Sequence, residues 1–278
     1  MDLIISDIHA DIDALNKIIN LASSSEFEQK HSKFSRILNL GDLLERGTNP
    51  KEVLNTLESL SRQYPIESVM GNHDEAHLYG KQVSGSSLES LDAHLNLKSE
   101  DLHFFQENND GTFGRHEFID KKNEIICVHG GPINPETIIP KDIVEDSWLY
   151  QKTWQRLSEE DFEFFSYSGY HYKPSSAFSS VKNHLENFII FCGHQHMEGI
   201  IEQYDNQITN LLPKTKSNKE KISDNLLEVR EIPIEPNKNY IIRVGLGGPQ
   251  GYYGTGHSRP HFGIADYDNK IVKLFSIL

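Results

Sequence analysis

Histidine, aspartate and asparagine recur along this chain in short groups, each of them directly after a run of apolar residues. In chain order the groups are Asp7-x-His9, Gly41-Asp42-x-x-Glu45-Arg46, Gly71-Asn72-His73-Asp74, His129-Gly130-Gly131 and Gly193-His194-x-His196. Imidazole, carboxylate and amide groups suit manganese, iron or zinc better than a metal that prefers thiolates. One such group alone is typical of a turn or a helix cap, whereas five in succession predict a metal site.

The apolar runs predict the strands that position these groups. Continuous apolar runs of about five residues, such as IICV and FIIFC, are typical of strands that are buried on both faces. Helical patterns separate the first runs: apolar residues fall on one face over 12–22, and Pro50 can open a second helix. This alternation predicts an α/β fold with a largely parallel or mixed sheet, whose polar groups gather at the carboxyl ends of the strands.

Length and charge limit the classes of function. The chain has 278 residues, of which 37% are hydrophobic and 24% charged, and no apolar run approaches the ~20 residues of a membrane helix. Its N-terminus carries acidic residues where a secretory signal would carry lysines. With 27 basic and 41 acidic residues the net charge is −14, the wrong sign for binding a long nucleic acid. We therefore expect a cytoplasmic protein that binds neither a membrane nor a long nucleic acid, with its oligomeric state left open.

Four further segments complete the expected organisation. Residues 86–110 have a helical pattern, and the aromatic-rich segment 148–172 predicts helices that cover the site, within a helical insertion over about 141–185. The polar, lysine-rich segment 213–225 predicts an exposed loop between two strands. The last third is β-rich and is expected to complete a second sheet. With no linker in the sequence, residues 1–278 are expected to form one domain.

Taken together, the five groups resemble the signature of the calcineurin-like metallophosphoesterases: D-x-H, G-D-x-x-x-R, G-N-H-[DE], H and G-H-x-H. The resemblance implies an αββα sandwich of two mixed sheets flanked by helices, with the metal site at the carboxyl ends of the strands. It also implies two metal positions. One is held by Asp7, His9 and His196, the other by Asn72, His129 and His194, and Asp42 bridges them.

Physical reasoning supports two cations that share a ligand. Two divalent ions about 3.5–4 Å apart need a shared anion to offset their repulsion, and a hydroxide that bridges them can attack phosphorus. Asp42, next to Gly41, is suited to the shared position. We expect two divalent transition-metal ions as cofactors, with manganese preferred and iron, zinc, nickel or cobalt as alternatives.

Three further residue types complete a phosphoryl-transfer site. The resemblance places His73 outside the metal ligands, so we expect it to protonate the leaving oxygen. Its ring needs a carboxylate partner, which is either Glu45 or Asp74, because the phosphoprotein phosphatases have aspartate at the position of Glu45. Arg46 is expected to bind a phosphate with its planar guanidinium.

The substrate is less narrowly indicated than the chemistry. The late Gly-rich stretch resembles a loop over the metal site in bacterial members of the family, so Tyr252, Tyr253, His257 and Arg259 are candidate substrate contacts. We expect a small phosphorylated substrate, with a nucleotide or dinucleoside polyphosphate as the first hypothesis. A Ser/Thr phosphoprotein or another phosphomonoester is the alternative within the same chemistry. The alternative of another class is a metal-binding interaction protein without turnover.

Overall fold

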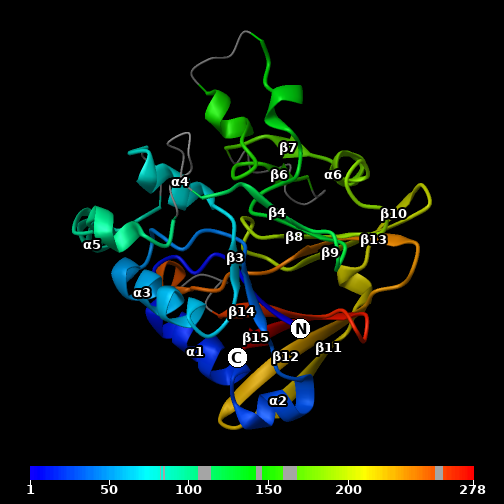
Figure 1. Ribbon diagram of the computed structural model, residues 1–278, viewed down its shortest axis with the longest axis horizontal. Coiled ribbons are helices and arrows are strands. Elements are labelled where there is room, and N and C mark those ends of the chain that lie inside the picture. Colours follow the sequence, from blue (N-terminus) through cyan, green and yellow to red (C-terminus); the bar gives the residue numbers. More distant parts are fainter. Residues whose placement is uncertain (82, 84, 106–113, 142–145, 159–167, 254–258) are drawn as a thin grey trace.

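The computed structural model describes residues 1–81, 83, 85–105, 114–141, 146–158, 168–253 and 259–278. Two β-sheets pack against each other, and helices cover the outer face of each (Figure 1). The predicted αββα sandwich of mixed sheets is confirmed. Among the described residues, no helix is both long enough and apolar enough to cross a bilayer.

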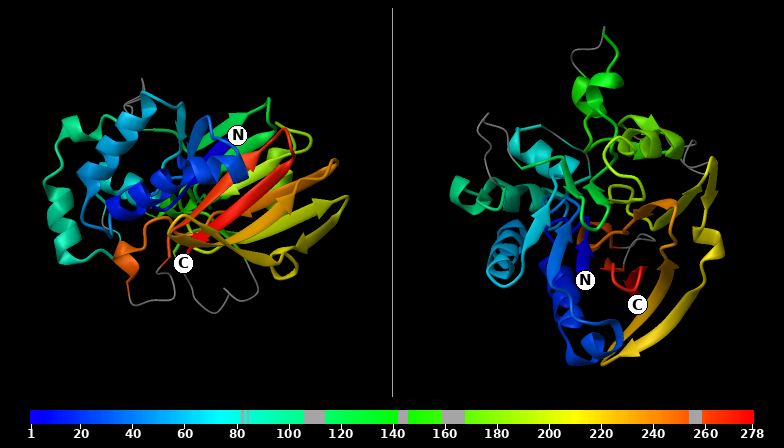
Figure 2. Two further views of the ribbon diagram at one scale, coloured as in Figure 1. Left: turned by 90° about the horizontal axis from the view of Figure 1, so that it is seen from below. Right: turned by 45° about the vertical axis from the view of Figure 1, so that its right-hand side comes forward.

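The larger sheet has seven strands in the order β11-β12-β15-β14-β1-β2-β3. Strands β1, β2 and β3 are parallel, and the remaining neighbours pair antiparallel. In chain order the strands are β1 (Asp2–Ile5), β2 (Arg36–Asn39), β3 (Ile66–Ser68), β11 (Ser217–Ile222), β12 (Asn225–Pro233), β14 (His261–Asp266) and β15 (Ile271–Ile277). Figure 2 shows the red C-terminal strands beside the N-terminal strand.

The smaller sheet has six strands in the order β10-β9-β13-β8-β5-β4. Its three central strands, β13, β8 and β5, are parallel to one another. In chain order the strands are β4 (Glu117–Asp120), β5 (Ile125–Val128), β8 (Ile189–Cys192), β9 (Gly199–Tyr204), β10 (Gln207–Asn210) and β13 (Lys238–Arg243). Each sheet therefore brings three parallel strands to the same end of the sandwich.

Helices cover both outer faces. In chain order the described α-helices are α1 (Ile12–Ala22), α2 (Ser25–His31), α3 (Pro50–Ser61), α4 (Asn72–Leu78), α5 (Leu88–Leu95) and α6 (Pro174–Val181). The predicted helices over 12–22 and from Pro50 are confirmed. Three buried clusters fill the layers: α1 and α3 pack on the larger sheet, the inner sheet faces pack on each other, and α6 packs on the smaller sheet.

The last four strands do not together complete a second sheet as predicted. Of these four, β12, β14 and β15 join the larger sheet, where β14 pairs with β1, and β13 alone enters the smaller sheet. Alternating polarity identifies a strand, but the choice of sheet depends on which distant strand it pairs with and on how the inner faces of the two sheets pack. This choice matters for function because the loop after β13 then runs beside the loop after β1.

The prediction of a polar loop over 213–225 is wrong. Residues Ser217–Ile222 form β11, which pairs antiparallel with β12 over six residues. The strand is exposed along most of its length and buries only Ile222 fully. An edge strand can carry lysines because they discourage pairing with another chain, so its composition resembles that of a loop.

The insertion over about 141–185 is only partly helical in its described residues. They form a 3₁₀ turn, Ser147–Tyr150, two short parallel strands, β6 (Arg156–Leu157) and β7 (His171–Tyr172), and helix α6. Described aromatic rings of the insertion contact each other in two pairs: Trp148 and Trp154 meet edge to face with centroids 4.6 Å apart, and the centroids of Tyr150 and Tyr170 are 5.7 Å apart. In the described part of segment 148–172, the aromatic residues lie in a 3₁₀ turn, short strands and loops rather than in a pair of helices.

Candidate metal centre and active site

Loops from both sheets meet at the carboxyl ends of the parallel strands. Backbone hydrogen bonds join them: the Asp7 N–H donates to the Gly41 carbonyl over 2.9 Å, and the Gly193 N–H donates to the His129 carbonyl over 2.9 Å. The two sheets are joined where the His194 N–H donates to the Asp7 carboxylate at 3.1 Å from Oδ2. Polar groups that are far apart in the sequence are thereby brought together.

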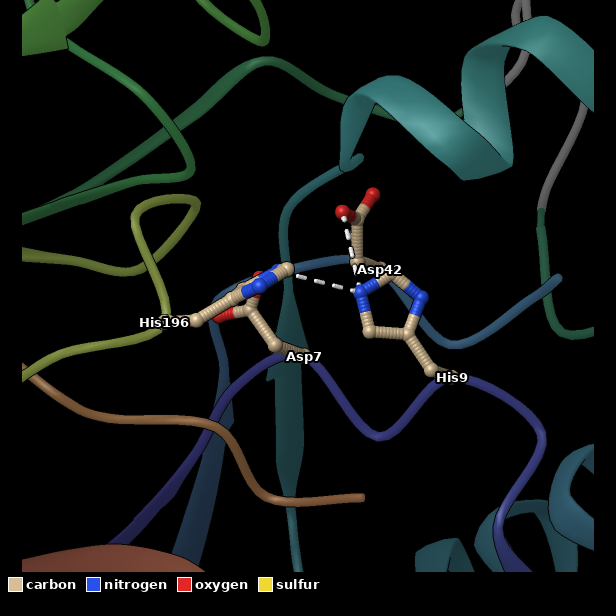
Figure 3. Close-up of side chains that lie close together, drawn as sticks. All are labelled: Asp7, His9, Asp42 and His196. Carbon is tan, nitrogen blue, oxygen red and sulfur yellow. Dashed lines mark hydrogen bonds and ion pairs between the residues drawn. The ribbon is translucent and has the colours of Figure 1, made fainter. Parts of the chain in front are cut away.

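The first ligand group contains Asp7, His9, Asp42 and His196 (Figure 3), with one ligand atom from each residue lying within 4.8 Å of the others. His9 Nε2 lies 3.3 Å from His196 Nε2 and 3.6 Å from Asp42 Oδ2. His196 Nε2 lies 3.3 Å from Asp7 Oδ1. The four side chains come from three different loops, and their donor atoms face a common point.

The second ligand group contains Asp42, His129 and His194, which are all buried. His129 Nε2 lies 3.2 Å from Asp42 Oδ2 and 3.1 Å from Asn72 Oδ1. Asp42 belongs to both groups, and no other residue does. The arrangement therefore has the shape of two adjacent cation positions with one shared carboxylate.

Backbone contacts set the tautomers of the ligand histidines. Nδ1 of His9 lies 3.1 Å from the Leu44 carbonyl, and Nδ1 of His129 lies 2.7 Å from the Leu40 carbonyl. A carbonyl oxygen can only accept, so each Nδ1 carries the proton. Nε2 is then the ring nitrogen left to bind a metal, which is how outer hydrogen bonds orient histidine for a metal.

The unpaired atoms in the site match what a metal ion would satisfy. Asp42 Oδ2 and His194 Nε2 are buried and have no hydrogen-bond partner among the described residues. A buried polar atom without a partner is destabilising by roughly 1–3 kcal/mol. The Nε2 atoms of His9 and His196 lie 3.3 Å apart. A cation bound by both nitrogen atoms would likewise account for this short distance. The residues present therefore fit divalent metal ions.

Electrostatics favours the metal-binding forms of His9, His194 and Asp42 but the protonated form of His129. Burial lowers the pKa of His9 and of His194 well below the usual value for histidine. Burial opposes the charge on Asp42 as well, yet His129 and His73 hold the pKa of this carboxyl well below its usual range. The neighbouring Asp42 carboxylate outweighs burial at His129 and raises its pKa to about 9. Since metal ligands must be deprotonated, binding of a metal at His129 releases a proton.

Backbone strain is concentrated in the ligand loops. Five of the ligands have a positive φ: Asp7 (53°), His9 (49°), Asp42 (57°), His194 (67°) and His196 (61°). For a residue other than glycine this left-handed conformation costs roughly 1–2 kcal/mol, and such strain persists where the surroundings hold it in place. Gly71 permits the close approach here, because a Cβ atom on it would lie 2.0 Å from Asp42 Oδ1.

The structure resolves which carboxylate faces His73. Glu45 Oε2 lies 2.8 Å from His73 Nδ1, so glutamate takes the place expected of either Glu45 or Asp74. The His73 ring lies beside the first ligand group, with its centroid 4.9 Å from that of His9. The phosphoprotein phosphatases have aspartate at this position. In this chain the longer glutamate side chain also reaches the His73 ring.

Asp74 faces backbone N–H groups and not the His73 ring, so its role is structural rather than catalytic. Its two oxygens accept backbone N–H groups at 2.8–3.0 Å from Asp42, Leu43, Leu44 and Gly71. Burial and the nearby Asp42 carboxylate raise the pKa of Asp74 to about 7, against the effect of the N–H donors. The carboxyl of Asp74 thus shapes the loop that presents Asp42.

Replacing Asp74 by asparagine should destabilise the fold. The amide NH₂ group would face two buried backbone N–H donors in place of an acceptor, so we expect the free energy of unfolding to fall by about 2 kcal/mol or more. Urea denaturation measures this change. The matched control is Asp13→Asn at an exposed position in α1, and equal unfolding midpoints for the two variants would contradict the structural role.

The predicted substrate contacts divide into two sets. Tyr252 lies in the site: its ring centroid is 4.9 Å from that of His196, and the Arg46 guanidinium carbon lies 4.8 Å from the centre of the Tyr252 ring. Tyr253 is 66% exposed. Arg259 is also exposed, and within the described part of the chain no contact joins it to the ligand groups. His257 lies outside the described residues.

Sequence reasoning missed two residues that support the site. The His94 ring on α5 accepts the Glu45 backbone N–H. Gln195, between two ligand histidines, accepts from the Leu157 N–H and from the buried Arg243 at 3.0 and 2.9 Å. His94 stands in no motif and Gln195 fills the variable position of Gly193-His194-x-His196, and no local pattern indicates partners 38 to 49 positions away.

Comparisons with known proteins agree with this geometry. The family model for calcineurin-like phosphoesterases matches residues 3–198. An uncharacterized protein of Methanocaldococcus jannaschii is 35% identical over 74 residues, which is 27% of this chain and 26% of the relative. The chain thus matches only about a quarter of that relative's length.

Two solved structures share the fold over the whole chain. A metallophosphoesterase from Sphaerobacter thermophilus has a TM-score of 0.56 at 19% identity, covering 100% of this chain and 87% of that chain. A protein serine/threonine phosphatase from Saccharomyces cerevisiae has a TM-score of 0.52 at 13% identity, covering 100% and 80%. At these identities the likeness concerns the fold alone.

Proposed function

Since this chain belongs to the calcineurin-like phosphoesterase family, we propose that it is a two-metal phosphoester hydrolase acting on a nucleotide or dinucleoside polyphosphate. The family and the ligand groups make it a metal-dependent phosphoesterase. One observation carries the two-metal part of the proposal: Asp42 alone belongs to both ligand groups. A single ion would leave one of the two groups of buried lone pairs without a partner.

Metal ions bound in the two groups would supply positive charge and lower the pKa of the attacking water. The residues of the chain do the remaining work. Asp42 places its carboxylate between the two ligand groups. Its negative charge would reduce the repulsion between the two cations. His73, held at Nδ1 by Glu45, would donate the Nε2 proton to the leaving oxygen as the phosphorus–oxygen bond breaks.

Arg46 is the residue best placed to neutralise phosphate charge. Its Nη1 donates to the Gly85 carbonyl over 3.3 Å, while its buried Nε has no hydrogen-bond partner among the described residues. The guanidinium carbon lies over the Tyr252 ring, which places the positive charge of Arg46 beside the first ligand group. With a net charge of −14 on the chain, attraction of an anionic substrate would depend on this local positive charge.

Tyr253 supports a substrate that carries a base. Its ring is 66% exposed, next in sequence to a tyrosine that contacts His196. Stacking of one base on an aromatic ring is worth about 1–3 kcal/mol. We therefore expect Tyr253→Ala to raise the KM for a dinucleoside tetraphosphate by about 5- to 150-fold and to leave the KM for an aryl phosphate unchanged.

Steady-state kinetics on both substrates checks this prediction. The matched control is Tyr204→Ala on β9, where an exposed tyrosine lies next to Lys238 rather than the ligand groups. Equal KM changes for the two substrates would remove Tyr253 from base recognition.

A substrate panel tests the proposed function as a whole. One preparation loaded with manganese is offered an aryl phosphomonoester, a phosphodiester, a dinucleoside tetraphosphate and a phosphoserine peptide. We expect the highest kcat/KM for the dinucleoside tetraphosphate. A higher value for the phosphopeptide would favour a protein phosphatase, and turnover of none of the four would contradict the hydrolase proposal.

A further inference from the structure

Helix α5 packs one face against the loop that carries Glu45 and Arg46. The inward side chains Ser90 and His94 are buried, while Leu88 and Leu95 on the outer face are 84% and 81% exposed. On the inner face, His94 Nε2 lies 2.6 Å from the backbone nitrogen of Glu45. This is the only hydrogen bond that the described residues give for the Glu45 N–H.

Both ring nitrogens of His94 have a defined role. Nδ1 lies 2.7 Å from the Ser90 carbonyl, which can only accept, so Nδ1 carries the proton. Nε2 then holds a lone pair and accepts the Glu45 N–H. A phenylalanine of similar size could fill the same space without accepting this hydrogen bond.

The backbone that His94 holds is strained. Glu45 and Arg46 have φ values of 64° and 65°, and two successive left-handed residues other than glycine need support from their surroundings. The segment before α5 gives further support, since the Arg46 N–H donates to Ser86 Oγ over 3.1 Å. The turn directs the Glu45 carboxylate towards His73 and the Arg46 side chain towards Tyr252.

We propose that His94 is a positioning residue for the reaction, holding Glu45 in the strained turn so that its carboxylate orients His73. The proposal rests on the proposed function, because it assigns His73 to protonation of the leaving group. One part of the proposal does not depend on turnover: the Glu45 N–H donates to His94 and not to water.

The kinetic test compares His94→Phe with His94→Gln, in which an amide oxygen can replace Nε2 as acceptor. A misplaced proton donor matters most for a poor leaving group. We expect His94→Phe to lower kcat for an alkyl phosphate by about 10- to 100-fold, the effect of a small displacement in an active site. For an aryl phosphate the loss should stay within about threefold, and His94→Gln should restore most of the alkyl rate. Equal losses on both esters would overturn the positioning role.

Ser87→Ala is the matched control for loss of helix stability. Ser87 caps α5 by accepting the Ser90 N–H over 3.1 Å, and the described residues give no hydrogen bond between Ser87 and Glu45. This variant should weaken α5 by about 1 kcal/mol without changing the ratio of alkyl to aryl rates. The same selective loss in Ser87→Ala would show that only the placement of α5 matters, which would overturn the role of His94.

Two measurements on zinc-loaded protein separate this proposal from the proposed function. Hydrogen exchange should show faster exchange in a peptide covering residues 43–47 in His94→Phe, and wild-type rates in His94→Gln. In wild-type protein, the nitrogen NMR signals of the His94 ring should show a protonated Nδ1 and an unprotonated Nε2, so the proposal stays testable if His94→Phe does not fold. Unchanged exchange or the opposite tautomer would overturn it even in an active enzyme, whereas inactivity with the expected exchange would count against the proposed function alone.

Discussion

Asp42→Asn is expected to lower kcat/KM for every phosphoester substrate by about 10³-fold or more. Asp42 is the one residue in both ligand groups, and the charge stabilisation that depends on a metal pair is worth several kcal/mol, with a factor of ten for each 1.36 kcal/mol. Asparagine keeps one oxygen but loses the negative charge that offsets the repulsion between two cations. We therefore expect the metal content to fall from two ions per chain to one or none, measured by elemental analysis after dialysis against a fixed manganese concentration.

Asp268→Asn removes the same charge at an exposed position and serves as the control. It should bind two ions and retain wild-type activity. Two ions bound as tightly by Asp42→Asn as by wild type would refute the shared-carboxylate arrangement. A wild-type chain that never binds more than one ion would do the same.

His73→Ala should lower turnover of an alkyl phosphate by about 10²- to 10⁴-fold, which is the usual contribution of general acid–base catalysis. The side chain lies beside His9 and is held by Glu45, yet it belongs to neither ligand group. The metal content should therefore stay at the wild-type level. The loss should be much smaller for an aryl phosphate, whose leaving group hardly needs a proton.

Single-turnover kinetics on both esters, together with metal analysis, provides the measurement. His184→Ala changes an exposed histidine after α6 and should behave as wild type. Equal losses on the alkyl and the aryl ester would mean that His73 does not protonate the leaving group. Loss of a metal ion would instead place His73 among the ligands.

The two variants also bear on the alternative of a metal-binding protein without turnover. Such a protein would need the ligand groups but not the pairing of His73 with Glu45 at 2.8 Å. In that case Asp42→Asn would still lose metal, and no phosphoester would be hydrolysed by any variant. Activity that depends on both residues would exclude this alternative.

Much of the fold and the ligand set could be predicted from the sequence. Each ligand directly follows a strand or begins a helix, so its type and its place at the end of an apolar run are local properties. The helices α1 and α3 likewise follow from apolar periodicity and, for α3, from Pro50 at its first position. The family match over residues 3–198 confirms the resemblance that these motifs indicated.

Other features depend on residues that are far apart in the chain, and only the tertiary structure decided them. The sheet that each C-terminal strand joins, the formation of β11 at an edge, and the choice of Glu45 over Asp74 beside His73 depend on pairing partners that local patterns do not specify. The same holds for His94, which lies 49 positions from the backbone nitrogen that it holds. Sequence alone determined which groups could bind metal and phosphate, because residue type sets their chemistry. Packing decided which of them touch, because hydrogen bonds and strained turns form only after the strand ends of both sheets have been brought together.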